Sequence, residues 1–205
     1  MNSHNSHRQS GFGMIEVLVT LIILMVGLLG LAGVMVQSQR SELESYQRVQ
    51  ALILLQDMSA RINANRQVSS CYAYTASNGT PYLGVAATAT PVCTIGTALQ
   101  NSQALQDMTD WSNQLAGAAE TAGGNQVGAM TGARGCINYA AGTEVPDKNG
   151  AAIPGSGIYT IAIAWQGSGS TAIATPNCAQ GLYGTDDAQR RVVSLTMRMA
   201  SLTSP

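Results

Sequence analysis

The longest apolar stretch of the chain lies close to its N-terminus. Residues 17–36 contain one Thr and no charged side chain. As a helix, a run of this length spans ~30 Å, which matches the hydrocarbon core of a bilayer. The pattern therefore predicts a transmembrane helix over this segment.

After residue 36 the apolar positions become periodic. Seven apolar residues recur at helical spacing, and we expect this stripe to be buried against a sheet: Leu43, Tyr46, Val49, Ile53, Leu55, Met58 and Ile62. Two acid-before-base pairs four residues apart, Glu44/Arg48 and Asp57/Arg61, are expected on the solvated side. No proline precedes Pro81, so the sequence predicts one helix over residues 12–66.

The rest of the chain predicts a mixed domain. Helical spacing predicts a short helix over residues 102–117, with Trp111 as a core anchor and Asp107 and Asp110 on a solvated face. Residues 68–99 are expected to form a disulfide-pinned loop, and residues 116–134 a Gly/Ala-rich linker.

Strands are predicted over residues 135–140, 159–166 and 191–199, and the last two alternate with period two. Consecutive strands joined by loops favour an antiparallel sheet. A long helix laid on one face of it gives an α+β fold.

One acidic residue interrupts the apolar N-terminal region. Glu16 stands directly before the apolar run, behind Phe12, Met14 and Ile15. A carboxylate at membrane depth costs about 3 kcal/mol on insertion scales, and such residues are by default functional. The alternative is that Glu16 marks the membrane edge and points at water.

The order Gly11-Phe12, Glu16 and then an apolar run resembles the N-terminus of type IV pilins and pseudopilins. The resemblance implies cleavage of the Gly11–Phe12 bond by a prepilin peptidase, methylation of the new N-terminal Phe12, and pairing of Glu16 with the terminal amine of a neighbouring subunit. The segments GMIEVLVTLIILMVGLLGLAG and QALILLQDMSARINANR resemble minor pilins of the PilV type.

This resemblance implies a type IV pilin-like fold and a minor pilin that enters or primes a type IV pilus, in support of pilus biogenesis, twitching motility or adhesion. The implied partners are the prepilin peptidase/methyltransferase, other major and minor pilins, and the inner membrane. Two alternatives are a type II secretion pseudopilin and a membrane-anchored periplasmic enzyme. No catalytic motif or metal-ligand spacing supports an enzyme, so we expect no cofactor and no metal.

Composition and the positions of the cysteines indicate in which cellular compartment the chain folds. Charged residues make up 10% of the chain and the net charge is −1, so no basic surface indicates nucleic-acid binding. All four cysteines follow the apolar run without a C-x-x-C pair, and the two histidines are His4 and His7 in the leader. Two disulfides in an oxidising compartment are expected. Four cysteines allow three pairings; we favour Cys71–Cys93 and Cys136–Cys178, because each closes a loop-rich segment.

The expected organisation follows. Residues 1–11 form a leader, 12–36 a membrane and filament-core helix, 37–66 its amphipathic half, and 67–205 a globular head. The cysteines and the resemblance place the head in the periplasm and later on the pilus, although Arg8 against Arg40 and Arg48 does not support that orientation by positive charge. A cleaved secretory signal peptide is the main alternative for this N-terminus. Gly27, Gly30 and Gly33 are expected either to allow a neighbouring helix to approach closely or to form a point where the helix can lose its backbone hydrogen bonds inside a filament.

Overall fold

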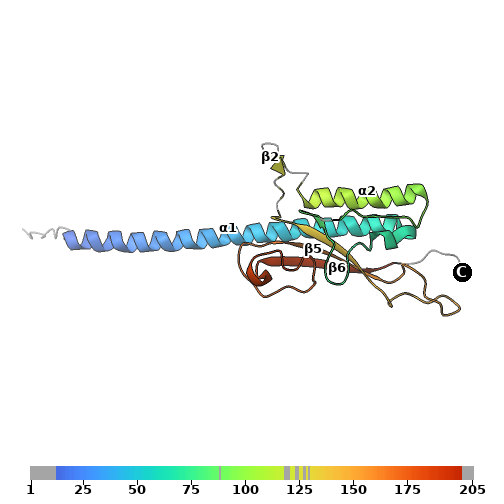
Figure 1. Ribbon diagram of the computed structural model, residues 1–205. Coiled ribbons are helices and arrows are strands. Elements are labelled where there is room, and N and C mark those ends of the chain that lie inside the picture. The colour runs from blue at the N-terminus through green and yellow to red at the C-terminus, as the bar shows by residue number, and fades with distance from the viewer. Residues whose placement is uncertain are drawn as a thin grey trace, which may run out of the picture. The chain divides into compact units, whose positions relative to one another are not determined.

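The computed structural model describes residues 13–87, 89–117, 121–122, 125–126, 128 and 130–199. The chain divides into two units, Met1–Leu43 and Glu44–Pro205, which are described separately. A single helix, α1 (Met14–Ala64), supplies the described part of the first unit and the beginning of the second (Figure 1). The long helix predicted for residues 12–66 is therefore present, two residues shorter at its C-terminal end.

The second unit is an α+β domain. Its sheet has four strands in the order β1-β4-β5-β6, and every neighbouring pair is antiparallel. The strands are β1 (Leu83–Gly84), β4 (Arg134–Ala140), β5 (Ile158–Gln166) and β6 (Arg190–Arg198). The three predicted strands and their antiparallel meander are confirmed. The two-residue β1, which extends the sheet beside β4, was not specified by the sequence.

Two helices cover one face of this sheet. The C-terminal half of α1 contributes five buried residues: Gln47, Ala51, Leu55, Met58 and Ile62. Beside it, α2 (Ala98–Leu115) buries Trp111, which is 0% exposed and donates its indole N–H to the carbonyl oxygen of Leu54 at 2.9 Å. The expected role of Trp111 as a core anchor is confirmed.

The buried face of α1 differs from the predicted stripe. Leu55, Met58 and Ile62 are buried as expected, but Leu43, Tyr46, Val49 and Ile53 are each about half exposed, at 50–54%. The helix has apolar residues on two sides, so periodicity alone could not tell which side meets the sheet. The position that faces inward one turn into the domain is Gln47, whose side-chain oxygen accepts the indole N–H of Trp165 at 3.2 Å.

Helix α2 begins four residues before the predicted start. Thr97 and Gln100 form a capping box, in which the Gln100 N–H donates to the Thr97 hydroxyl at 3.3 Å and the Thr97 N–H donates to Gln100 Oε1 at 2.9 Å. This motif satisfies backbone donors that a first helical turn leaves unpaired. The first turn carries no apolar periodicity, which is why the apolar pattern placed the start too late.

The remaining elements are short. A 3₁₀ helix η1 (Arg66–Tyr72) follows α1, and η2 (Thr185–Asp187) precedes β6. The stretch expected to be a linker contains a small antiparallel pair, β2 (Thr121–Ala122) and β3 (Asn125–Gln126).

The second face of the sheet is covered by chain rather than by solvent. Ala162 and Ala164 of β5 are buried there, in a cluster with Tyr82, Cys136, Cys178, Ala179 and Tyr183. The period-two alternation along β5 therefore does not separate buried side chains from exposed ones. Arg190, which is 0% exposed, donates to the carbonyl oxygens of Ala174, Pro176 and Cys178 and lies 2.7 Å from the Asp187 carboxylate, so it ties this covering loop to β6.

Contact between α2 and the sheet depends on the absence of a side chain at Gly135. A Cβ at this position of β4 would lie 2.3 Å from the Trp111 ring and 2.6 Å from Leu115. We predict that Gly135→Ala lowers the free energy of unfolding by about 1–3 kcal/mol, because a packed core must shift to accept the extra methyl group. Urea unfolding followed by tryptophan fluorescence measures this effect.

Gly169→Ala is the matched control, since a Cβ there meets nothing within 4 Å. Equal free energies of unfolding for the two variants would contradict the close contact between Trp111 and β4.

Candidate functional site

The described part of the structure begins at Gly13, inside the N-terminal motif. Gly11 and Phe12, the expected cleavage and methylation positions, lie outside the described residues. Glu16 occupies the first turn of α1, where its backbone N–H donates to the carbonyl oxygen of Gly13 at 2.9 Å. A carboxylate in the first turn interacts favourably with the helix dipole. The Glu16 side chain is exposed, so it is available to a group outside this chain.

The surface that follows Glu16 is apolar on every side of the helix. All large hydrophobic side chains between Met14 and Val36 are exposed, from 46% at Val19 to 87% at Met14. Covering a side chain of this kind contributes roughly 1–3 kcal/mol, so the segment as a whole strongly favours a nonaqueous environment. By length and composition α1 is the one helix in the described part of the chain that can cross a membrane.

Gly27, Gly30 and Gly33 lie within this apolar surface. The helix continues through all three, and a Cβ at any of them would meet nothing within 4 Å. In the single chain these glycines therefore contact no neighbour. Their expected roles, close helix approach or local unwinding in an assembly, stay predictions.

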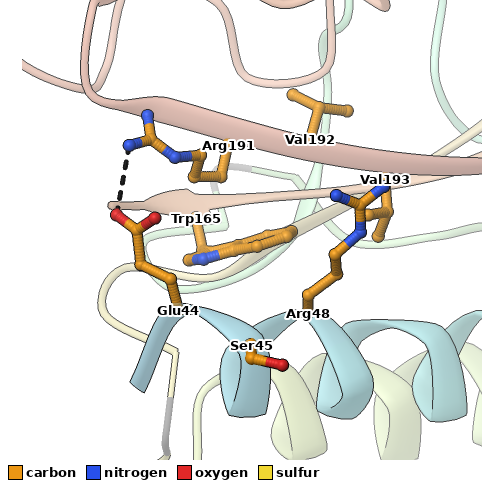
Figure 2. Close-up of a pocket in the computed structure, with 7 residues that line it drawn as sticks. All are labelled: Glu44, Ser45, Arg48, Trp165, Arg191, Val192 and Val193. Carbon is orange, nitrogen blue, oxygen red and sulfur yellow. Dashed lines mark hydrogen bonds and ion pairs between the residues drawn. The ribbon is translucent and has the colours of Figure 1, made fainter. Parts of the chain in front are cut away.

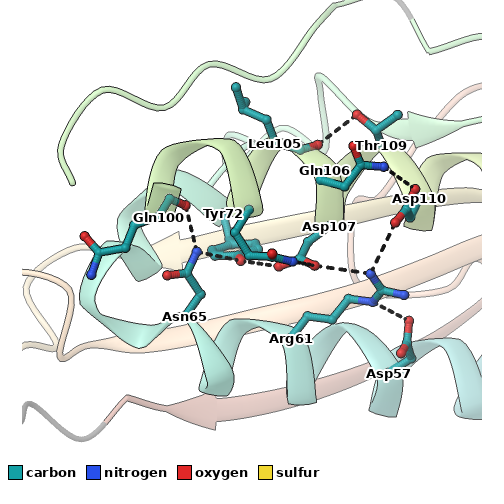
Figure 3. A network of polar contacts seen from close by, with 11 residues as sticks. Asp57, Arg61, Asn65, Tyr72, Gln100, Leu105, Gln106, Asp107, Thr109 and Asp110 are labelled. Carbon is teal, nitrogen blue, oxygen red and sulfur yellow. Dashed lines mark hydrogen bonds and ion pairs between the residues drawn. The ribbon is translucent and has the colours of Figure 1, made fainter. Parts of the chain in front are cut away.

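In the second unit, a polar network joins α1, η1 and α2 (Figure 3). Asp107 accepts the hydroxyl of Tyr72 at 2.6 Å, Nη1 of Arg61 at 3.2 Å and the side-chain amide of Gln103 at 2.9 Å. Arg61 also pairs with Asp57 at 2.8 Å and approaches Asp110 at 3.8 Å. Burial, together with the neighbouring Asp107 carboxylate, raises the pKa of Tyr72 above its usual value, so this phenol remains a hydrogen-bond donor at neutral pH.

The expectation of a solvated face for both carboxylates is wrong at Asp107. This residue is 4% exposed, whereas the Asp110 side chain is 41% exposed. Asp107 lies inward because two partners come from segments 35 and 46 residues away, Tyr72 and Arg61. Sequence spacing within α2 could not reveal them. The predicted Asp57/Arg61 pair is present.

Glu44 also has a different partner from the one expected. Its carboxylate pairs with Arg191 of β6 at 3.2 Å and accepts the Ser168 hydroxyl at 2.8 Å, instead of pairing with Arg48 (Figure 2). The hydrogen bond from Ser168, aided by the Arg191 charge and opposed by partial burial, lowers the pKa of Glu44. Arg48 has no hydrogen-bond or ion-pair partner among the described residues.

Two disulfides fasten the loops of the second unit. Cys71–Cys93 joins η1 to the segment before α2, with a Cα–Cα distance of 5.1 Å. Cys136–Cys178 joins β4 to the loop that covers the second sheet face, with a Cα–Cα distance of 5.7 Å. This is the pairing favoured among the three that the sequence allows. Within the described residues, no group of three or more His, Cys, Asp or Glu side chains could hold a metal ion.

Residues 6–32 match the family described as "Prokaryotic N-terminal methylation motif". The match covers Gly11, Phe12 and Glu16 and most of the apolar run, and it supports a type IV pilin-like or pseudopilin protein. In comparisons with curated proteins and with solved structures, no match was found.

The buried network gives a test of which carboxylate holds α1, η1 and α2 together. We predict that Asp107→Ala lowers the free energy of unfolding by about 3–5 kcal/mol, because it leaves the Tyr72 hydroxyl and part of the Arg61 charge unpaired. Asp110→Ala removes an exposed, more distant carboxylate from the same arginine and should cost less than about 1 kcal/mol. Urea unfolding measures both values; similar losses would show that burial of Asp107 does not govern the network.

Proposed function

We propose that this chain is a minor pilin of the PilV type, which is inserted into the inner membrane as a precursor and then enters, or primes assembly of, a type IV pilus. The observation that carries the proposal is the combination of a methylation motif with a fully apolar, exposed helix surface directly behind Glu16. The α+β head with two disulfides fits an oxidising compartment outside the cytoplasm.

In this proposal the chain is processed by a peptidase/methyltransferase and has no catalytic role itself. Cleavage after Gly11 places a charged amine on Phe12, four residues before Glu16 in the sequence. In a filament, Glu16 accepts the amine of the adjacent subunit, while the surface from Met14 to Val36 is covered by the helices of other pilins. The head then faces outward and contacts other pilins or an external surface.

Deletion of the gene tests the role directly. Deletion should reduce the number of surface pili and twitching motility, and the wild-type gene should restore both. Unchanged piliation together with a secretion defect would instead assign the chain to a type II secretion machine as a pseudopilin.

Processing gives a chemical prediction. Protein isolated from its native host should begin at Phe12 and carry an N-methyl group. Mass spectrometry of the intact protein and of its N-terminal peptide measures both. Retention of Met1, or a new N-terminus near Gly33, would contradict cleavage at Gly11.

A second prediction concerns Glu16. Glu16→Leu should still insert into the membrane and still be cut after Gly11, because loss of the carboxylate removes a cost of insertion. It should fail to co-purify with sheared pili, since breaking a desolvated pair typically costs 3–5 kcal/mol. Glu16→Asp should be intermediate, because it keeps the charge on a shorter side chain.

The control for Glu16→Leu is Glu42→Leu. Glu42 is an exposed carboxylate on the same helix, outside the apolar run, and its loss should leave incorporation into pili unchanged. Wild-type incorporation of Glu16→Leu would favour the alternative in which Glu16 only marks the membrane edge.

A further inference from the structure

Strand β6 is an edge of the sheet with an open hydrogen-bonding side. It is the last strand in the order β1-β4-β5-β6 and pairs with β5 along its whole length. Beyond its ends, the Gly167 N–H donates to Gln189 O, and the Met199 N–H donates to Gly157 O. Because antiparallel pairs alternate, these two bonds place the odd-numbered residues of β6 in hydrogen-bonded pairs with β5.

The even-numbered residues of β6 therefore direct their backbone groups away from the sheet. Among them are the N–H and C=O groups of Val192, Ser194, Thr196 and Arg198. No backbone partner from another described segment reaches them. The strand has nine residues and contains no proline or lysine, and its three arginines stand at its two ends, so the segment from Val192 to Met197 carries none of the charges or prolines by which natural edges commonly resist pairing.

A groove runs between this edge and α1. It has a volume of about 300 Å³ and is lined by Glu44, Ser45 and Arg48 of α1, Trp165 of β5, and Arg191, Val192 and Val193 of β6. Figure 2 shows the Arg48 side chain extending from the helix toward Val193. A helix thus forms one wall, and the strand with the open edge forms the other.

The groove carries one arginine, Arg48, that no acidic side chain among the described residues neutralises. The carboxylate of Glu44 is engaged by Arg191 at 3.2 Å, which leaves exposed Arg48 unpaired within the described part of the molecule. Further along the same helix and strand, apolar surface is also incompletely covered: Leu52, one helical turn after Arg48, is 43% exposed, and Leu195 and Met197 of β6 are only partly buried. An occupant would need both a carboxylate and apolar side chains.

We propose that this groove binds an extended segment of another protein, which adds to β6 as a fifth strand. The segment alternates apolar residues, which cover Leu52 and Leu195, with polar ones, and it places an Asp or Glu beside Arg48. Addition of a strand to an open edge supplies affinity through main-chain hydrogen bonds and specificity through alternate side chains. This site lies wholly in the second unit and goes beyond the proposed incorporation of the N-terminal helix into a pilus.

A second copy of this chain does not fit the groove through its own sheet edges. Its β6 carries Arg190, Arg191 and Arg198 and no acidic residue, so it offers no carboxylate to Arg48. Its opposite edge, β1, has two residues and cannot pair along a nine-residue strand. Charge and length therefore favour a different polypeptide as the partner.

The test uses the full chain in detergent micelles and fluorescent nonapeptides that alternate Val with Thr, with a single Glu moved through the Thr positions. At least one peptide should bind saturably with a dissociation constant below about 1 mM. Arg48→Gln should weaken that peptide by about fivefold, as expected for an exposed ion pair. Arg66→Gln, which removes an exposed arginine from η1, should leave binding unchanged.

Backbone methylation separates strand addition from simple attraction of charge. Two versions of the bound peptide are compared, one N-methylated at its odd-numbered residues and one at its even-numbered residues. One version should bind at least about tenfold more weakly and the other should lose much less affinity, because only one set of N–H groups faces β6. Ser194→Pro should weaken binding similarly, since it removes an outward N–H while sparing the bonds to β5. If this variant fails to fold, the methylated peptides still decide.

Several results would overturn the proposal. They are the absence of saturable binding by every peptide, an equal loss of affinity for the two N-methylated versions of the peptide, and full affinity of the peptide for Arg48→Gln. A dimer of the full chain that Ser194→Pro dissociates would show that the edge serves a second copy instead.

Discussion

The N-terminal half of α1 has an apolar surface that the rest of the described chain leaves exposed, and the protein must cover it. From Met14 to Val36 every large hydrophobic side chain is exposed. Water disfavours such a surface at every residue, so the segment must lie either in a bilayer or against other helices. A protein that uses the same helix first as an anchor and then as a filament core satisfies this constraint in both states. Glu16 is the one charged group within it, and its desolvation is acceptable only where a partner charge is supplied.

The second unit is stabilised in a different way. It has few charged residues and long Gly-rich loops, so its stability depends on disulfides and on a few buried polar contacts. Two disulfides hold the loops to η1 and β4, while Arg190 binds three loop carbonyl groups from a fully buried position. Asp107 connects α2 to Tyr72 of η1 and to Arg61 of α1. The same domain leaves one edge strand open beside an arginine that has no partner among the described residues, and this is where we propose that a partner binds.

Much of the fold could be predicted because it depends on local periodicity. A helix or strand that buries one side repeats apolar residues at a regular spacing, and this spacing is visible in a short stretch of sequence. Examples are the helical spacing around Trp111, the alternation along β5 and β6, and the long helix without proline. The features that were missed depend on residues far apart in sequence. The apolar stripe placed Tyr46 on the inward side of α1, but the structure has Gln47 there, and this depends on Trp165, 118 residues later. The burial of Asp107 and Arg190 likewise depends on partners in other segments. The motif at Gly11, Phe12 and Glu16 could be recognised because it is contiguous, whereas the groove beside β6 required the sheet order.

Incorporation into a pilus requires that the apolar surface of α1 be covered inside the filament. The most direct measurement is the reactivity of single introduced thiols toward a maleimide in intact, sheared pili, with Leu28→Cys in the apolar run and Asn149→Cys in an exposed turn of the head. If the chain is a filament subunit, the thiol at position 149 should react in intact pili, while the thiol at position 28 should react only after the filaments are denatured. Equal reactivity of the two thiols in intact pili, or absence of the wild-type chain from the sheared fraction, would contradict it.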